Sequence, residues 1–294
     1  MPMRLKDKKT GFLLRHTHLL HVAPVSVWVV LFVFAPLVIV VYYSFVSTEA
    51  FGTIIPTLTL KNYEYVFHSA LGRILARSLI YAMLANMACL LMGYPVAYWI
   101  ATQGGKFKAF FVFLVVVPSW TCYIIRVYAA KMVLEESGLL NNIFLRLDLI
   151  SSPLEMLYTP GAVLLGLAYI WLPFMVLPIY AALDGLDPSV LEAAADLGAT
   201  PLHRFFTVTL PLTKGGIFAG TILTSIPALG DWLVPYILGG NKKWMAGNYV
   251  QYYFVVRGDF SIGSSMAVAL TATVILMIYL FTKLGGEEAL ERII

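Results

Sequence analysis

Long apolar segments constrain the fold of this chain more than any other feature of its sequence. Runs of about 20 apolar residues recur, and that is the length a helix needs to cross roughly 30 Å of hydrocarbon. Only 12% of the 294 residues are charged, about half the share found in soluble domains. A spanning β-barrel would show alternating segments of about ten residues, and the sequence contains none. The sequence therefore predicts an all-α polytopic membrane protein.

Six transmembrane helices are expected, joined by one tight glycine turn at 102–108 and by longer mixed segments at 46–77 and 130–160. The six predicted spans are 22–45, 78–101, 109–129, 161–183, 216–238 and 262–283. Residues 1–21 carry five of the lysines and arginines, which favours a cytoplasmic tail. An even number of spans returns the C-terminus to the same side. We expect one six-span domain over 22–294, with residues 184–215 as a cytoplasmic loop.

The loop 184–215 contains signals for two short helices. Asp187-Pro188 and Thr200-Pro201 each combine an N-capping side chain with a proline at the first helical position. Gly198 suits the end of the first helix, because glycine readily adopts the left-handed conformation. The second helix is expected to run through Val208, followed by a bend at Leu210-Pro211.

Such short helices are marginal on their own in water, because nucleation is costly. Their apolar side chains need a packing partner. Two interpretations are open: the helices dock into the groove of a soluble cytoplasmic protein, or the loop folds back on its own bundle.

The spacing of Glu192-Ala193-Ala194, Gly198 and Leu210-Pro211 resembles the EAA motif of ATP-binding-cassette importer permeases, with Val208 at a position where the family has isoleucine. In that family the loop forms coupling helices that dock into a cleft of a cytoplasmic ATPase dimer. The resemblance thus implies a fold like that of type I importers. The ATPase-coupling candidates are Glu192, Ala193, Ala194, Gly198, Leu202, Phe205 and Phe206.

Segments 118–142, 171–183, 209–223 and 226–240 resemble the first permease component of spermidine/putrescine importers, although Ala130 stands where that group has tryptophan. The resemblance implies a polyamine cargo, a second homologous permease, an external substrate-binding protein and a bacterial inner-membrane location. Permeases of the same family for an opine, an aminophosphonate or iron are the alternative. A secondary transporter is the alternative from another class.

The chain is not expected to be an enzyme. No G-x-x-x-x-G-K-[ST] motif occurs, so ATP hydrolysis is assigned to a partner. No grouping of nucleophile and base is readable. His16, His18 and His21 lack acidic or cysteine neighbours, so neither a metal site nor a cofactor is predicted, and the modest charge of +4 does not favour nucleic acid.

A carboxylate deep in the fifth predicted span is the leading candidate for contact with substrate. Asp231 lies about 21 Å along that helix, where a charge must face protein or water. It has three candidate roles: pairing with a cationic substrate, pairing with Arg126, or capping a kinked helix near Pro227. Aromatic side chains can offer faces to ammonium groups or form interfacial belts. The substrate-path candidates are Asp231, Trp232, Trp171, Trp120 and Tyr123.

Overall fold

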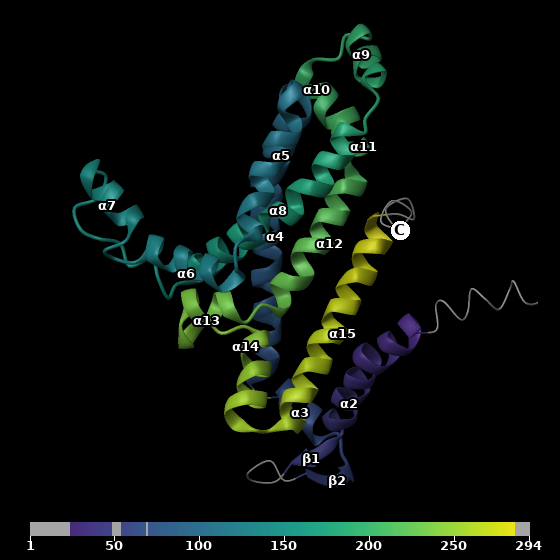
Figure 1. Cartoon of the computed structure of the whole chain (residues 1–294), viewed down its shortest axis with the longest axis vertical. Coiled ribbons are helices and arrows are strands. Elements are labelled where there is room, and N and C mark those ends of the chain that lie inside the picture. The colour runs from purple at the N-terminus through teal and green to yellow at the C-terminus, as the bar shows by residue number, and fades with distance from the viewer. Residues whose placement is uncertain (1–23, 49–53, 69, 286–294) are drawn as a thin grey trace, which may run out of the picture.

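The computed structural model describes residues 24–48, 54–68 and 70–285, and nearly all of them are helical. The helices form an elongated bundle, with α9 (Pro188–Asp196) and α10 (Pro201–Arg204) at one end and α3 (Lys61–His68) at the other (Figure 1). The predicted all-α membrane architecture is confirmed. The expected cytoplasmic tail, 1–21, lies outside the described residues.

Four straight helices are long and apolar enough to span a membrane. The first, Pro24–Ser44, includes η1 (Val30–Phe34) and α2 (Ala35–Ser44). The others lie in α4 (Ala70–Gln103), α8 (Pro160–Asp184) and α15 (Phe260–Gly285). They correspond to the predicted spans 22–45, 78–101, 161–183 and 262–283. However, α4 begins eight residues earlier than predicted, and its 34 residues make it about 51 Å long.

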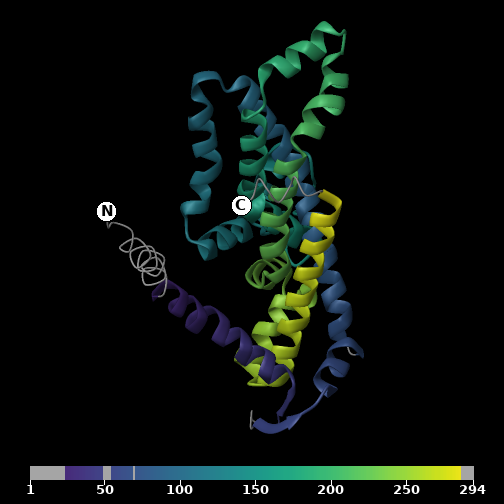
Figure 2. The same cartoon turned by 90° about the vertical axis from the view of Figure 1, so that its right-hand side faces the viewer.

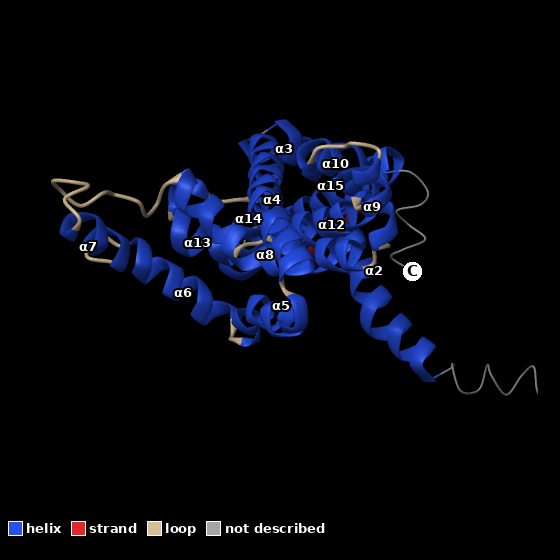
Figure 3. Cartoon of the chain, turned by 90° about the horizontal axis from the view of Figure 1, so that it is seen from above, coloured by secondary structure: helices blue, strands red, loops and turns tan. Residues whose placement is uncertain are grey.

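The third predicted span, 109–129, is not one straight helix. The chain forms η3 (Gly105–Phe107), α5 (Lys108–Val116) and η4 (Val117–Trp120), and then bends by 94° into α6 (Tyr123–Leu134) and α7 (Leu139–Arg146). Thr121 and Cys122 are extended at the bend. As a result α6 and α7 project to one side of the bundle, which Figure 3 shows from above.

The fifth predicted span, 216–238, is also interrupted. Helix α12 (Lys214–Gly230) ends before Asp231, and α13 (Leu233–Gly239) begins two residues later. Pro227 lies inside α12 and does not break it. A second bent pair joins the end of the loop, Pro201–Leu212, to α12 at 63°. If each bent pair counts as one span, the described residues contain six spans.

The end of the bundle opposite α9 contains the only sheet among the described residues. Strands β1 (Val46–Thr48) and β2 (Ile54–Leu58) pair antiparallel, so the segment expected to be mixed, 46–77, contains two strands as well as α3. Both strands are rich in β-branched residues, which suit a pleated strand. The same end includes η6 (Asn241–Lys243), α14 (Ala246–Gln251) and η7 (Tyr252–Arg257).

Helices α4, α8 and α12 form the tightly packed centre, while the first span lies largely outside the bundle (Figure 2). Two glycines on one face of α12 allow the close approach to α8. A Cβ on Gly216 would lie 2.6 Å from the Cβ of Ala182, and one on Gly220 would lie 2.7 Å from the Sδ of Met175. Small residues four apart are typical of close helix contacts in membranes.

Candidate functional site

The loop between α8 and α12 extends from the bundle as a helical hairpin (Figure 1). The start of α5 lies at the same end, because Lys108 Nζ contacts Asp184 Oδ1 at 2.6 Å. This ion pair raises the pKa of Lys108. The tight turn at 102–108 and the base of the hairpin are therefore joined on one side of the bundle.

The first hairpin helix, α9, has both of the predicted end structures. The Asp187 carboxylate accepts a hydrogen bond from the Ser189 N–H at 2.9 Å, and this bond lowers the pKa of Asp187. Gly198 has φ +82°. Its N–H donates to the Ala195 carbonyl at 2.9 Å, and the Ala199 N–H donates to the Ala194 carbonyl at 3.1 Å. This pair of bonds is a Schellman motif, so Gly198 sets the direction of the chain after α9.

The second helix is longer than predicted. Thr200 Oγ1 accepts from the His203 N–H at the start of α10, and the helix continues through η5 (Phe205–Thr209), which has π geometry, and α11 (Leu210–Leu212). The bend expected at Leu210-Pro211 instead follows Leu212. Pro211 lies inside this continuous helix, where it donates no backbone hydrogen bond, and the turn before it has π geometry, with the Leu210 N–H donating to the Phe205 carbonyl.

One aromatic side chain attaches the hairpin to its own bundle. The Phe205 ring packs edge-on against Tyr94 at 5.6 Å and against Tyr98 at 5.7 Å between centroids, and both tyrosines lie on α4. Close by, the Tyr94 and Thr213 hydroxyls are 2.9 Å apart. Arg204 Nη1 donates to the Leu191 carbonyl at 3.3 Å and links the two hairpin helices.

The opposite surface of the hairpin is apolar and uncovered. Exposed fractions are 89% for Leu197, 71% for Leu202 and 57% for Phe206. Glu192, Ala193 and Gly198 are exposed as well, and Ala194 is half-buried. Phe205 thus folds back on α4, as the second interpretation of the loop expects, while the other coupling candidates are exposed or half-buried.

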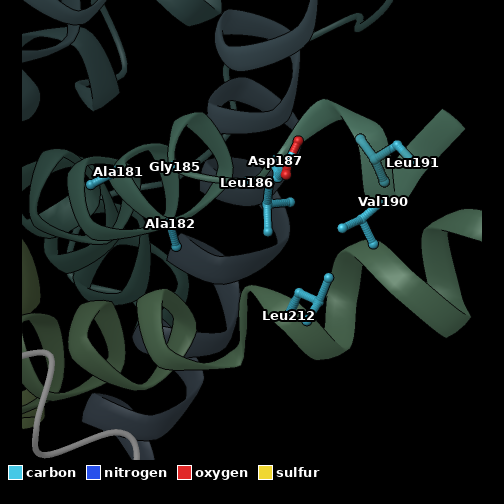
Figure 4. Close-up of a pocket in the computed structure, with 8 residues that line it drawn as sticks. All are labelled: Ala181, Ala182, Gly185, Leu186, Asp187, Val190, Leu191 and Leu212. Carbon is cyan, nitrogen blue, oxygen red and sulfur yellow. The ribbon is translucent and has the colours of Figure 1, made fainter. Parts of the chain in front are cut away.

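A cavity of about 270 Å³ lies at the base of the hairpin (Figure 4). It separates the end of α8 from α9 and α11. Its lining is mostly aliphatic and consists of Ala181, Ala182, Gly185, Leu186, Asp187, Val190, Leu191 and Leu212. The hairpin is therefore attached at Phe205 and loosely packed at its base.

Asp231 lies at the break between α12 and α13 and is 6% exposed. Its carboxylate accepts from the Tyr123 hydroxyl at 2.6 Å and from the N–H groups of Leu233 and Val234 at 3.0 and 3.2 Å. It caps α13 and joins the break to the first turn of α6. Among the described residues, no ion pair connects Asp231 to Arg126, whose guanidinium lies 6.0 Å from the centre of the Tyr123 ring.

The remaining substrate-path candidates are distributed unevenly around this carboxylate. The Trp171 ring lies 6.4 Å from the Tyr123 ring. Trp232 follows Asp231 and is 41% exposed, and its carbonyl accepts a hydrogen bond from the Asn248 side chain. Trp120 is 72% exposed and packs against Phe113 at 5.5 Å. The structure thus brings Asp231, Tyr123 and Trp171 together, places Trp232 beside them, and leaves Trp120 apart.

Sequence reasoning missed Asn248, which supports the break through the Trp232 carbonyl. Asn248 accepts a hydrogen bond from the Met245 N–H while it holds the Trp232 carbonyl. Nothing in the local sequence distinguishes this asparagine from a turn residue. No cluster of metal-binding side chains occurs in the described part of the chain, and the three N-terminal histidines lie outside it.

Comparison with known proteins identifies the family. A family model described as "Binding-protein-dependent transport system inner membrane component" matches residues 93–284. The spermidine/putrescine transport system permease protein PotB of Escherichia coli (strain K12) is 38% identical over 256 residues, which cover 87% of this chain and 93% of the relative. PotB of Haemophilus influenzae is 37% identical and covers 89% and 92%. The inner membrane ABC transporter permease protein YdcU of E. coli is 35% identical and covers 90% and 88%.

Solved structures confirm the fold. A chain of a bacterial ABC transporter that imports the acidic polysaccharide alginate superposes with a TM-score of 0.75 at 17% identity and covers 95% of this chain and 97% of its own. An inward-facing MetNI methionine ABC transporter gives a TM-score of 0.54 at 18% identity, with coverage of 74% and 94%. From the family model and the curated relatives together, the chain belongs to the binding-protein-dependent transport system inner membrane components.

Proposed function

We propose that this chain is the permease subunit of an ATP-driven bacterial importer for polyamines. The observation that carries the proposal is identity of 37–38% to spermidine/putrescine permeases over nearly nine-tenths of the chain. The cargo is then an aliphatic amine with at least two positive charges. Residues of this chain line part of the path of the cargo, and a separate ATPase hydrolyses ATP.

The hairpin α9–α10 is the proposed docking element for a cytoplasmic ATPase dimer. Leu197 lies at the end of α9, Leu202 in α10 and Phe206 in η5, and all three are exposed. Burial of each large apolar side chain contributes about 1.5–3 kcal/mol. Glu192, Ala193, Ala194 and Gly198 set the shape of the same surface. Phe205 acts on the other side and carries the motion of the ATPase into α4.

We further propose that a second, homologous permease completes the pathway and that a periplasmic binding protein delivers cargo to the end that bears α3 and η7. The first span supports this arrangement, since most of its apolar surface is left uncovered by its own chain. Both chain termini are assigned to the cytoplasmic side, together with the hairpin.

The proposed pathway passes the break at Asp231. Tyr123, Trp171 and Trp232 surround this position, and the bend of α6 brings Tyr123 to it. Asp231 is the proposed holder of the break, because its carboxylate accepts hydrogen bonds from Tyr123 on α6 and from the first two N–H groups of α13. Trp232 is the proposed contact with cargo, and Trp120 is assigned to the outer rim.

The test is reconstitution of the chain with its second permease, ATPase and binding protein in liposomes, followed by uptake of labelled putrescine and spermidine. Leu202→Asp is expected to abolish co-purification of the ATPase and ATP-dependent uptake. Leu58→Asp is the matched control for co-purification of the ATPase, because Leu58 is similarly exposed, at 77%, but lies in β2 at the opposite end of the bundle. Wild-type uptake by the Leu202 variant would contradict the docking role. A wild-type complex that imports neither amine would contradict the cargo.

A further inference from the structure

Five aromatic rings follow one another from the helix break toward the end that bears α3. They are Trp232, Tyr236, Trp244, Tyr252 and Tyr253, and we call this set the aromatic file. The centroids of successive rings lie 6.4, 6.4, 5.6 and 5.8 Å apart. Although the residues span 22 positions of sequence, the break, α13, the segment before α14 and η7 bring their rings into one continuous series.

An ordinary interfacial belt explains the file poorly. Belt aromatics point their polar tips toward water or lipid headgroups. The Trp244 indole N–H is instead buried and has no hydrogen-bond partner among the described residues. The backbone of Trp244 is fixed from the other side, because its carbonyl accepts a hydrogen bond from the Arg77 guanidinium. The Trp244 ring is thus held between its neighbours, Tyr236 and Tyr252.

The outer end of the file already holds a cation. The exposed Arg257 guanidinium lies 5.9 Å from the Tyr252 centroid and 5.8 Å from the Tyr253 centroid. These distances lie within the range at which a ring quadrupole attracts a positive charge. The Tyr252 and Tyr253 rings therefore already attract one cation at this end, with the Tyr253 ring itself only 6% exposed.

We propose that the aromatic file conducts the ammonium groups of a linear polyamine between the outer surface and the break at Asp231. This inference rests on the proposed function, since it requires an amine cargo. Two ammonium groups joined by four methylene groups lie about 6 Å apart at bond lengths of about 1.5 Å. That length is comparable to the ring spacing of 5.6–6.4 Å, so one molecule is long enough to reach two successive rings.

The same geometry explains how cargo leaves again. Each ring binds a cation weakly, and a series of similar weak sites permits movement from one to the next without a deep trap. The Asp231 carboxylate at the inner end is engaged by Tyr123 and by the first turn of α13. It therefore adds negative potential without becoming a tight salt-bridge partner. Arg257 leaves the outer rings when the cargo takes its place.

The first test compares Tyr236→Leu with Tyr236→Phe in the reconstituted importer, with loaded binding protein at saturation. Loss of one ring face is expected to lower the uptake rate by about three- to thirty-fold, whereas phenylalanine keeps the face and stays within about two-fold. ATPase stimulation by the binding protein should be retained in both variants. Tyr279→Leu is the control, because Tyr279 is a 58% exposed tyrosine on α15, outside the file. Equal uptake by the leucine and phenylalanine variants would overturn the proposal.

The second test distinguishes ring electrostatics from packing. Fluorinated tryptophans placed at position 244 keep the ring size but weaken its negative face, so uptake should fall stepwise with the number of fluorine atoms. The same series at Trp99, which lies on α4 and packs against Phe111 of α5, should leave the uptake rate unchanged. If the wild type imports polyamine and the uptake rate does not change with fluorination at Trp244, conduction by the aromatic file is refuted while the cargo assignment stands. An inactive wild type would refute the cargo assignment instead.

Discussion

Gly198 permits a quantitative prediction about the coupling hairpin. Its φ of +82° is a left-handed conformation, and a Cβ added there meets nothing within 4 Å. Substitution therefore acts through backbone strain and not through a clash. An ordinary L-residue in this conformation costs about 1–2 kcal/mol. That cost lowers the population of the native hairpin relative to alternative geometries by about five- to thirty-fold.

We expect Gly198→Ala to weaken ATPase binding by up to this factor, measured by titration of the ATPase onto the detergent-solubilised permease. Gly198→Asn should weaken it less, because asparagine tolerates the left-handed region. Gly105→Ala is the matched control: Gly105 also has positive φ, +50°, with nothing within 4 Å, but it lies outside the hairpin. An asparagine variant as impaired as the alanine variant, or unchanged binding by the alanine variant, would refute the reasoning.

Three further predictions concern packing, the helix break and pH. Gly220→Ala should destabilise the bundle by about 1–3 kcal/mol through overpacking on Met175, which a lower Tm in detergent would show. Gly230→Ala is the control and should leave the Tm unchanged, because open space surrounds Gly230. Equal Tm values for the two variants would argue against tight α8–α12 contact. Asp231→Ala leaves three buried donors without their acceptor and should cost about 1–3 kcal/mol; an unchanged Tm would exclude the capping role. Because the pKa of Asp187 is lowered below 3.8 in the folded chain, its cap should stabilise α9 above that pH and lose its effect as the pH falls through the lowered value. Hydrogen exchange of the α9 amides should show this acid-dependent loss in the wild type but not in Asp187→Asn, and identical profiles would count against it.

The hairpin could be predicted from sequence because its determinants are local. Each helix begins at a capping residue followed by proline, and α9 ends at a glycine. These signals act over three or four residues and need no other part of the chain. The apolar length that identifies α8 and α15 is equally local.

The two breaks could not be predicted, because they depend on residues far apart in sequence. The break at Asp231 is held by Tyr123, which lies 108 residues earlier. Hydropathy alone treats both breaks as continuous spans. Proline was a misleading guide, since Pro227 remains within α12 while the interruption follows Gly230. The sequence therefore indicates the substrate-path candidates without their geometry and gives no sign of the aromatic file.

The attachment of the hairpin to α4 determines which motions remain available to it. Phe205 is held between two tyrosine rings, and Thr213 is held by the hydroxyl of one of them. Together with the packing of Leu186 and Leu210 against the same part of the bundle, these contacts oppose sliding of the hairpin along α4 and leave rotation about this attachment as the motion that disturbs fewest contacts. The cavity behind α9 provides the room for such a rotation. In the proposed importer, a partner that pushes on the exposed tip would deliver a torque to α4, and the sense of that torque would depend on which side of the attachment the partner presses.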